Sequence, residues 1–138
     1  MKSVILVIVV ALFIFSCDKN VGSAGCSGLG DSTVVTIRYG EKKYPCNSSS
    51  ACFGFTKLID DSRCPEGAAC VWRGSASIEM ETCGGKEGSL ALEIYHPVEQ
   101  LIDGNKYSIE LTALNPYPST SHPHDVSEYV ATITIKKK

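Results

Sequence analysis

Apolar and polar residues alternate along most of the chain after residue 32. In residues 74–82, Ala76, Ile78 and Met80 fall on one side of an extended backbone, and polar residues fall on the other. A period of two is typical of half-buried strands, and no stretch beyond the first sixteen residues sustains the spacing of a helical stripe. The same alternation, or a short apolar run beside a turn, predicts further strands in residues 33–40, 41–46, 51–60, 89–96, 106–114 and 128–138.

Short glycine-containing connectors separate these predicted strands. Residues 83–88 read CGGKEG, and Asp103-Gly104-Asn105 suits the positive φ angles of a tight hairpin. About seven short strands with frequent turns predict an all-β domain, a single antiparallel β-sandwich of the immunoglobulin type. A small β-barrel is the alternative. The alternation does not indicate the order of the strands.

The first sixteen residues differ in character from the rest of the chain. Lys2 precedes an unbroken apolar run, Val4 to Phe15, which is too short for a bilayer core that needs about 20 apolar residues. The run suits the hydrophobic region of a signal peptide. The tetrad IFSC at residues 14–17 resembles a bacterial lipobox. The resemblance implies cleavage before Cys17, a diacylglycerol group on its sulfur, and a fatty acid such as palmitate on its new amine.

These features divide the chain into a signal peptide (1–16), a lipidated Cys17 with a flexible tether (17–31), and one β-domain (32–138). Residues 18–31 contain four glycines and almost no large apolar side chains, so they bury too little surface to fold. Without residues 1–16 the chain has 12 basic and 15 acidic residues, and this mild negative charge argues against a nucleic-acid partner. The lipid anchor predicts a bacterial cell-envelope location at the outer membrane, on its periplasmic face or at the cell surface.

Six cysteines remain after Cys17, and an even number in an exported protein indicates disulfide bonds. Only local spacing ranks the possible pairings. Two cysteines bracket PEGAA (65–69), whose proline and glycine favour a reversing turn. Two more bracket NSSSA (47–51), a polar loop of the same length. The spacing therefore predicts the disulfides Cys64–Cys70, Cys46–Cys52 and, for the remaining pair, Cys26–Cys83.

The stretch DSRCPEGAACVWRG, residues 61–74, contains the first of these predicted rings and the only tryptophan. We expect Asp61 and Ser62 to hydrogen-bond to nearby backbone and Arg63 to pair with an acid, because short polar side chains fix loops in this way. The stretch thus predicts a stapled corner between two strands.

Trp72 offers the largest apolar surface of the stretch and shares the strand parity of Ala76, so we expect it to pack in the core. The alternative is an exposed Trp72 that forms a sugar-stacking surface with Tyr95 or Tyr117. The candidate binding residues are therefore Arg63, Trp72 and Tyr117.

No set of residues completes a catalytic or metal site in the sequence. His122-Pro123-His124 places two imidazoles on one side of an extended chain, but no further ligand completes a zinc or copper site, so exposed loop histidines are expected. Cysteine catalysis needs a free thiol beside a base, whereas disulfide pairing can use all six exported cysteines. We therefore expect no enzyme activity, no catalytic residue, no bound metal and no cofactor.

The stretch 61–74, together with YSIELTALNPYP (107–118) and YVATITIKK (129–137), resembles a family of small exported lipoproteins of Bacteroidota. These proteins share a D-S-R-C-P-x4-C-x-W-x-G core, and some members are carried on conjugative transposons. The resemblance extends over most of the chain from Thr33 to Ile135. It implies an exported β-domain and carries no activity and no catalytic residues with it.

The combined expectation is a membrane-anchored lipoprotein with a non-enzymatic β-domain, a binding or accessory component of the cell envelope. Membrane lipid contacts it through Cys17, and a protein or a glycan is its further partner. The alternative is an inhibitor-type module that inserts the ring closed by Cys64 and Cys70 into a partner enzyme, since a closed ring loses little entropy on binding. The exposure of residues 65–69 separates a presented loop from a merely structural corner.

Overall fold

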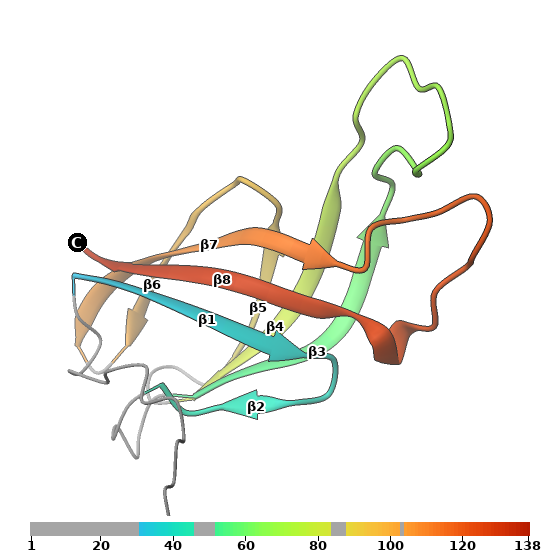
Figure 1. Cartoon of the computed structure of the whole chain (residues 1–138). Helices are drawn as coiled ribbons and strands as arrows, with labels where there is room; N and C mark the ends of the chain where they lie inside the picture. The colour runs from blue at the N-terminus through green and yellow to red at the C-terminus, as the bar shows by residue number, and fades with distance from the viewer. Residues whose placement is uncertain (1–30, 46–51, 84–87, 103) are drawn as a thin grey trace, which may run out of the picture.

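The computed structural model describes residues 31–45, 52–83, 88–102 and 104–138 (Figure 1). The predicted signal peptide, Cys17 and the tether up to residue 30 lie outside the described residues, and so do Cys26 and Cys46. Within the described ranges, no helix is long and apolar enough to cross a membrane.

The described residues form two four-stranded sheets in which every strand pair is antiparallel (Figure 1). The first sheet contains, in spatial order, β1 (Ser32–Arg38), β8 (Val130–Lys137), β7 (Asn105–Asn115) and β6 (Val98–Ile102). The second contains β2 (Lys42–Lys43), β3 (Cys52–Asp61), β4 (Ala76–Cys83) and β5 (Gly88–Glu93). A 3₁₀ helix, η1 (Val126–Glu128), precedes β8, and the described residues include no α-helix. The predicted all-β sandwich is confirmed, and its sheets do not close into a barrel.

In both sheets, strands that are hydrogen-bonded to each other are consecutive in the chain, with one exception: the last strand, β8, pairs with the first, β1. The sandwich is therefore a meander, and not the Greek-key arrangement of immunoglobulin domains. Ser32 pairs with Lys136, whereas Arg38 and Asn115 both lie opposite Val130. The chain thus enters the first sheet at one end of the sandwich, and β7 finishes at the other end.

The core lies between the two sheets and is built from the alternating apolar rows. Ala76, Ile78 and Met80 are fully buried, as the alternation predicts. In β7 the register shifts between Leu111 and Ala113, so Leu114 becomes the next fully buried residue of the strand. The other buried core residues are Ile37, Phe53, Phe55, Leu92, Ile94, Ile102, Tyr107, Ile109, Tyr129, Ala131, Ile133 and Ile135.

β6 is a strand that the alternation did not predict. It is five residues long, and the half-buried Gln100 interrupts the apolar row of Val98 and Ile102. The turn expected around residues 103–105 does connect β6 to β7, because Ile102 pairs with Asn105 and Gly104 has a φ of 76°. Asp103 itself lies outside the described residues.

The disulfides agree with the sequence prediction in one case and correct it in another. Cys64 and Cys70 are bonded, with their Cα atoms 5.9 Å apart. Cys52, however, is bonded to Cys83, which lies directly opposite it in the β3–β4 ladder at a Cα–Cα distance of 4.8 Å. The predicted pairs Cys46–Cys52 and Cys26–Cys83 are therefore wrong. Their basis was loop spacing, whereas the pairing of two strands joins residues separated by 31 positions.

Candidate functional site

The segment between β3 and β4, residues 62–75, extends beyond the end of the sandwich and is here called the disulfide loop (Figure 1). Its base is closed by two backbone hydrogen bonds. The Ser62 amide donates to the Ser75 carbonyl at 2.8 Å, and the Cys64 amide donates to the Arg73 carbonyl at 2.9 Å. Beyond this base, the Cys64–Cys70 disulfide closes a ring of seven residues. The loop is thus held by covalent and hydrogen bonds that do not depend on a partner.

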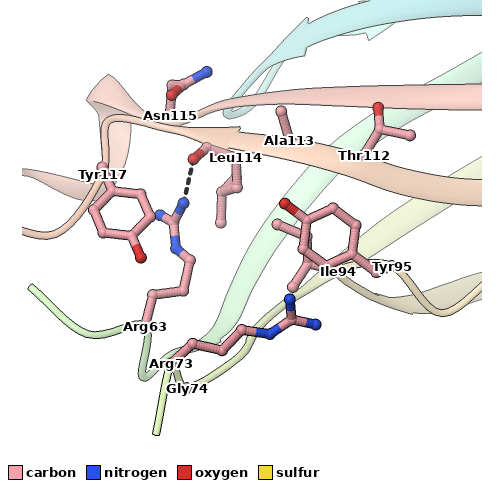
Figure 2. Close-up of a pocket in the computed structure, with 10 residues that line it drawn as sticks. All are labelled: Arg63, Arg73, Gly74, Ile94, Tyr95, Thr112, Ala113, Leu114, Asn115 and Tyr117. Atoms are coloured by element: carbon pink, nitrogen blue, oxygen red, sulfur yellow. Dashed lines mark hydrogen bonds between the residues drawn. The ribbon is translucent and has the colours of Figure 1, made fainter. Parts of the chain in front are cut away.

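Arg63 anchors the disulfide loop to the end of β7. Its Nε and Nη2 atoms donate to the two carboxylate oxygens of Asp61 at 2.7 and 2.8 Å, so the ion pair is bidentate. Nη1 donates to the Leu114 carbonyl at 2.5 Å (Figure 2). Nη2 also donates to the Pro116 carbonyl, at 3.0 Å. The guanidinium also lies 4.6 Å from the ring centroid of Tyr117. The predicted pairing of Arg63 with an acid is therefore confirmed. Most of the hydrogen-bonding capacity of the Arg63 guanidinium is used by groups of the protein itself.

This ion pair is buried, since the side chains of Arg63 and Asp61 are each only 6% exposed. The hydroxyl of Tyr129 supplies a third hydrogen bond to Asp61, at 3.1 Å. Burial raises the pKa of Tyr129, and the neighbouring carboxylate of Asp61 raises this pKa further. Tyr129 therefore remains a neutral donor around neutral pH, and the network joins the end of β3, the residue that precedes β8, and the disulfide loop.

A second segment supports the ring. The Glu66 amide donates to the Pro118 carbonyl at 2.8 Å, and the Thr120 amide donates back to the Glu66 carbonyl at 3.4 Å. The Asn115–Pro116 peptide bond that begins this segment is cis. Residues 115–120, here called the proline segment, therefore run beside the ring and contact its backbone.

Gly74 allows the disulfide loop to rejoin the sheet. Its φ is +70°, and a Cβ atom at this position would lie 1.8 Å from the Ser62 carbonyl oxygen. Only glycine tolerates both this left-handed conformation and this close approach of backbone. The backbone therefore leaves the extended conformation before β4 begins at Ala76.

The expectation that Trp72 packs in the core is wrong, because its side chain is 68% exposed. The parity argument extended the β4 alternation backward through Gly74, where the chain is not extended. Residues 66–73 are all exposed, and Val71 is completely exposed. The segment that was predicted to be a packed structural corner is therefore a loop that faces solvent. Tyr95 and Tyr117 are also exposed.

An open cleft of about 210 Å³ lies between the disulfide loop and the end of β7 (Figure 2). Tyr117 lies at one side of the cleft and Tyr95 at the other, and both arginines of the loop reach toward it. The guanidinium of Arg73 lies over the Tyr95 ring, at 5.2 Å from its centroid. The lining residues are Arg63, Arg73, Gly74, Ile94, Tyr95, Thr112, Ala113, Leu114, Asn115 and Tyr117.

The cleft brings together two of the three predicted binding residues, Arg63 and Tyr117, whereas Trp72 is exposed on the loop and is not among the lining residues. Sequence reasoning did not single out Arg73. Its contact with Tyr95 joins positions from separate loops, so no local pattern signals it. Tyr95 itself occupies a turn with a φ of 65° and donates its amide hydrogen to the Leu111 carbonyl at 3.0 Å.

The two histidines of the HPH motif have separate environments. His122 contacts the hydroxyl of Ser121, and His124 contacts the carboxylate of Glu128 at 3.1 Å. In the part of the chain that the structure describes, no three His, Cys, Asp or Glu side chains are grouped as metal ligands.

No protein-family model matches the chain, and neither a curated protein nor a solved structure is significantly similar to it. The structure itself places the protein in the class of disulfide-bonded antiparallel β-sandwich proteins. Its distinguishing surface is the exposed disulfide loop beside a charged cleft.

Proposed function

We propose that this protein is a non-enzymatic, lipid-anchored lipoprotein of a bacterial cell envelope that binds a protein partner through the disulfide loop. The observation that carries the proposal is the exposure of residues 66–73 on a ring whose conformation the protein itself fixes. A loop that is ordered before binding loses less conformational entropy when it binds, so more of its contact energy appears as affinity.

The exposed side chains of the loop support a protein as the partner. Val71 and Trp72 expose adjacent apolar surface, and Arg73 follows them. Tryptophan, tyrosine and arginine are the residues that most often dominate the binding energy of protein interfaces. A sugar-stacking surface is less well supported, because the rings of Tyr95 and Tyr117 each already have an arginine guanidinium over one face.

The position of the loop also suits a tethered protein. Ser32, where the predicted tether joins the domain, lies at the Lys136 end of the first sheet. Arg63 bonds to Leu114 and Pro116, which lie at the opposite end. A strand rises about 3.3 Å per residue, so the seven residues of β1 separate these ends by about 20 Å. The loop therefore lies at the end of the domain opposite the point where a tether from Cys17 would join it.

Inhibition of a partner enzyme is the specific form of binding that the exposed ring favours. Residues 65–69 were expected to face solvent in an inhibitor and to be packed in a structural corner, and Glu66 to Ala69 are exposed. In this version of the proposal, the ring enters the active site of the partner. Activity assays on a partner identified by the cross-linking described next, with and without this protein, test this version.

Site-specific photo-cross-linking in the cells that produce the protein tests the binding proposal. A photoreactive amino acid replaces Val71 in one variant and Val34 in a matched control, since Val34 is also an exposed valine (64%) but lies on β1. We expect a discrete protein adduct from position 71 that is absent from position 34, and its yield should fall when Trp72→Ala is added. Equal adducts from both positions, or none from position 71, contradict the proposal.

Metabolic labelling with a clickable fatty acid tests the lipid anchor. The wild-type protein should incorporate the label and fractionate with membranes, because the lipobox-like tetrad ends in Cys17. Cys17→Ala should incorporate none. Continued labelling of Cys17→Ala would show that the lipid is attached to another residue and would contradict the proposed anchor.

A further inference from the structure

We infer that the cleft beside the disulfide loop binds a carboxylate of the partner protein, an Asp or Glu side chain, through Arg73. This inference rests on the proposed binding function and specifies the chemistry of the partner. It starts from the unequal charge balance of the two arginines that line the cleft.

Arg63 is electrically compensated and Arg73 is not. The carboxylate of Asp61 neutralises Arg63, and two backbone carbonyls take further hydrogen bonds from it. Among the described residues, no carboxylate forms an ion pair with Arg73. The guanidinium of Arg73 instead contacts the ring of Tyr95. The cleft therefore carries one uncompensated positive charge, which favours an anionic ligand.

Arg73 is also held in place before any ligand arrives. Its backbone carbonyl accepts the hydrogen bond from Cys64 that closes the base of the loop. Its guanidinium lies over the ring of Tyr95, whose own turn is fixed by the hydrogen bond to Leu111. Among the described residues, none accepts a hydrogen bond from the guanidinium N–H groups of Arg73, and these groups match the two oxygens of a carboxylate.

The size of the cleft indicates a single side chain and not a larger ligand. Pockets for small molecules and cofactors have volumes of about 300–1,000 Å³. This cleft, at about 210 Å³, is smaller than that range and open to solvent. Thr112 and Asn115 also line the cleft, but the hydroxyl of Thr112 already donates to the Thr132 carbonyl at 3.1 Å, so Arg73 is the group left to bind a carboxylate. Val71 and Trp72, exposed on the same loop, offer apolar contact to the residues that flank the acidic one.

Nuclear magnetic resonance on the full-length protein, labelled with ¹⁵N-arginine, tests the inference with defined probes. The probe is the blocked tripeptide acetyl-Ala-Glu-Ala-amide, and its matched control contains Gln in place of Glu. We expect a saturable shift of the Arg73 Nε–H signal with the Glu peptide, and binding about tenfold weaker with the Gln peptide, because a hydrogen bond to a charged group contributes this much.

Two variants assign the effect. Arg73→Gln should reduce binding of the Glu peptide to the level of the Gln peptide, whereas Lys136→Gln should leave it unchanged. Lys136 is exposed near the tether end of the sandwich, and its replacement removes the same charge from the molecule. Circular dichroism confirms that both variants are folded.

Equal affinity for the two peptides, no saturable shift with either, or an equal loss in Lys136→Gln would overturn the inference. Inorganic phosphate that displaces the Glu peptide at similar concentration would also overturn it, because the site would then be a general anion site. Cross-linking from position 71 that persists while the Glu peptide fails to bind leaves the loop as the partner site without the carboxylate. Binding of the Glu peptide without cross-linking from position 71 instead removes the proposed role of the loop.

Discussion

Asp61→Asn removes the charge from the carboxylate that holds the disulfide loop to the sandwich. In the wild-type protein this carboxylate accepts two hydrogen bonds from Arg63 and one from Tyr129, at 2.7, 2.8 and 3.1 Å. Asparagine has nearly the same shape, but one of its two oxygens is replaced by an NH₂ group. This group would face an N–H donor, and the buried guanidinium of Arg63 would lose its counter-charge.

The expected loss of stability follows from the burial of the pair. Removing one partner of a buried ion pair costs about 3–5 kcal/mol, because the other charge is left without compensation. Arg63 would keep the carbonyls of Leu114 and Pro116 and the ring of Tyr117, and a cation–π contact offsets about 1 kcal/mol. We therefore expect Asp61→Asn to lower the free energy of unfolding by about 3 kcal/mol.

Urea unfolding followed by far-ultraviolet circular dichroism measures this change. Fluorescence is a poor probe, because the only tryptophan is already exposed in the folded protein. Glu81→Gln is the matched control, since Glu81 pairs with Lys42 at 2.8 Å with both side chains more than 40% exposed. Such a pair contributes at most about 1 kcal/mol. If Asp61→Asn costs no more than Glu81→Gln, the buried network does not hold the loop as we argue.

The remaining predictions concern the surface, the backbone and pH. Trp72→Ala should change the free energy of unfolding by less than about 0.5 kcal/mol, whereas Phe53→Ala in the core should cost about 3–5 kcal/mol; similar costs in urea unfolding would place Trp72 in the core after all. Gly74→Ala should cost more than Gly40→Ala, because both glycines have positive φ but only the Cβ at position 74 would collide with backbone. The same urea assay tests this order, and equal costs would contradict the close approach. The pKa of the Tyr129 hydroxyl is raised in the folded state, so the unfolded chain loses the hydroxyl proton first as the pH rises above 10.0. Above this pH, the free energy of unfolding of the wild-type protein should therefore fall more steeply than that of Tyr129→Phe. Parallel stability–pH curves for these two proteins would contradict the burial of the hydroxyl.

The sequence predicted the class of fold and much of the core. Alternation along β4 and β8 identified the buried rows correctly, including Ile78, Met80 and Ile133. This information is local, because successive side chains of a strand point to opposite faces whatever the strand pairs with. It was also enough to predict the Cys64–Cys70 ring, whose turn is encoded by the residues between the two cysteines.

The tertiary structure decided where distant segments meet. Cys52 and Cys83 are bonded because β3 and β4 pair in a particular register, which no local spacing reveals. The exposure of Trp72 depends on Gly74, whose positive φ and contact with the Ser62 carbonyl end the alternation before the tryptophan is reached. An argument from parity holds only while the backbone stays extended.

In the candidate site, too, local sequence predicted some features and only the tertiary structure decided the others. The sequence predicted that Arg63 pairs with an acid, but it did not name Asp61, which was expected to hydrogen-bond to nearby backbone instead. The cleft required the disulfide loop, the Tyr95 turn and the end of β7, which are separated along the chain and adjacent only in the folded sandwich. Composition and spacing specify which side chains are available, and strand register and loop anchoring determine which of them share a surface.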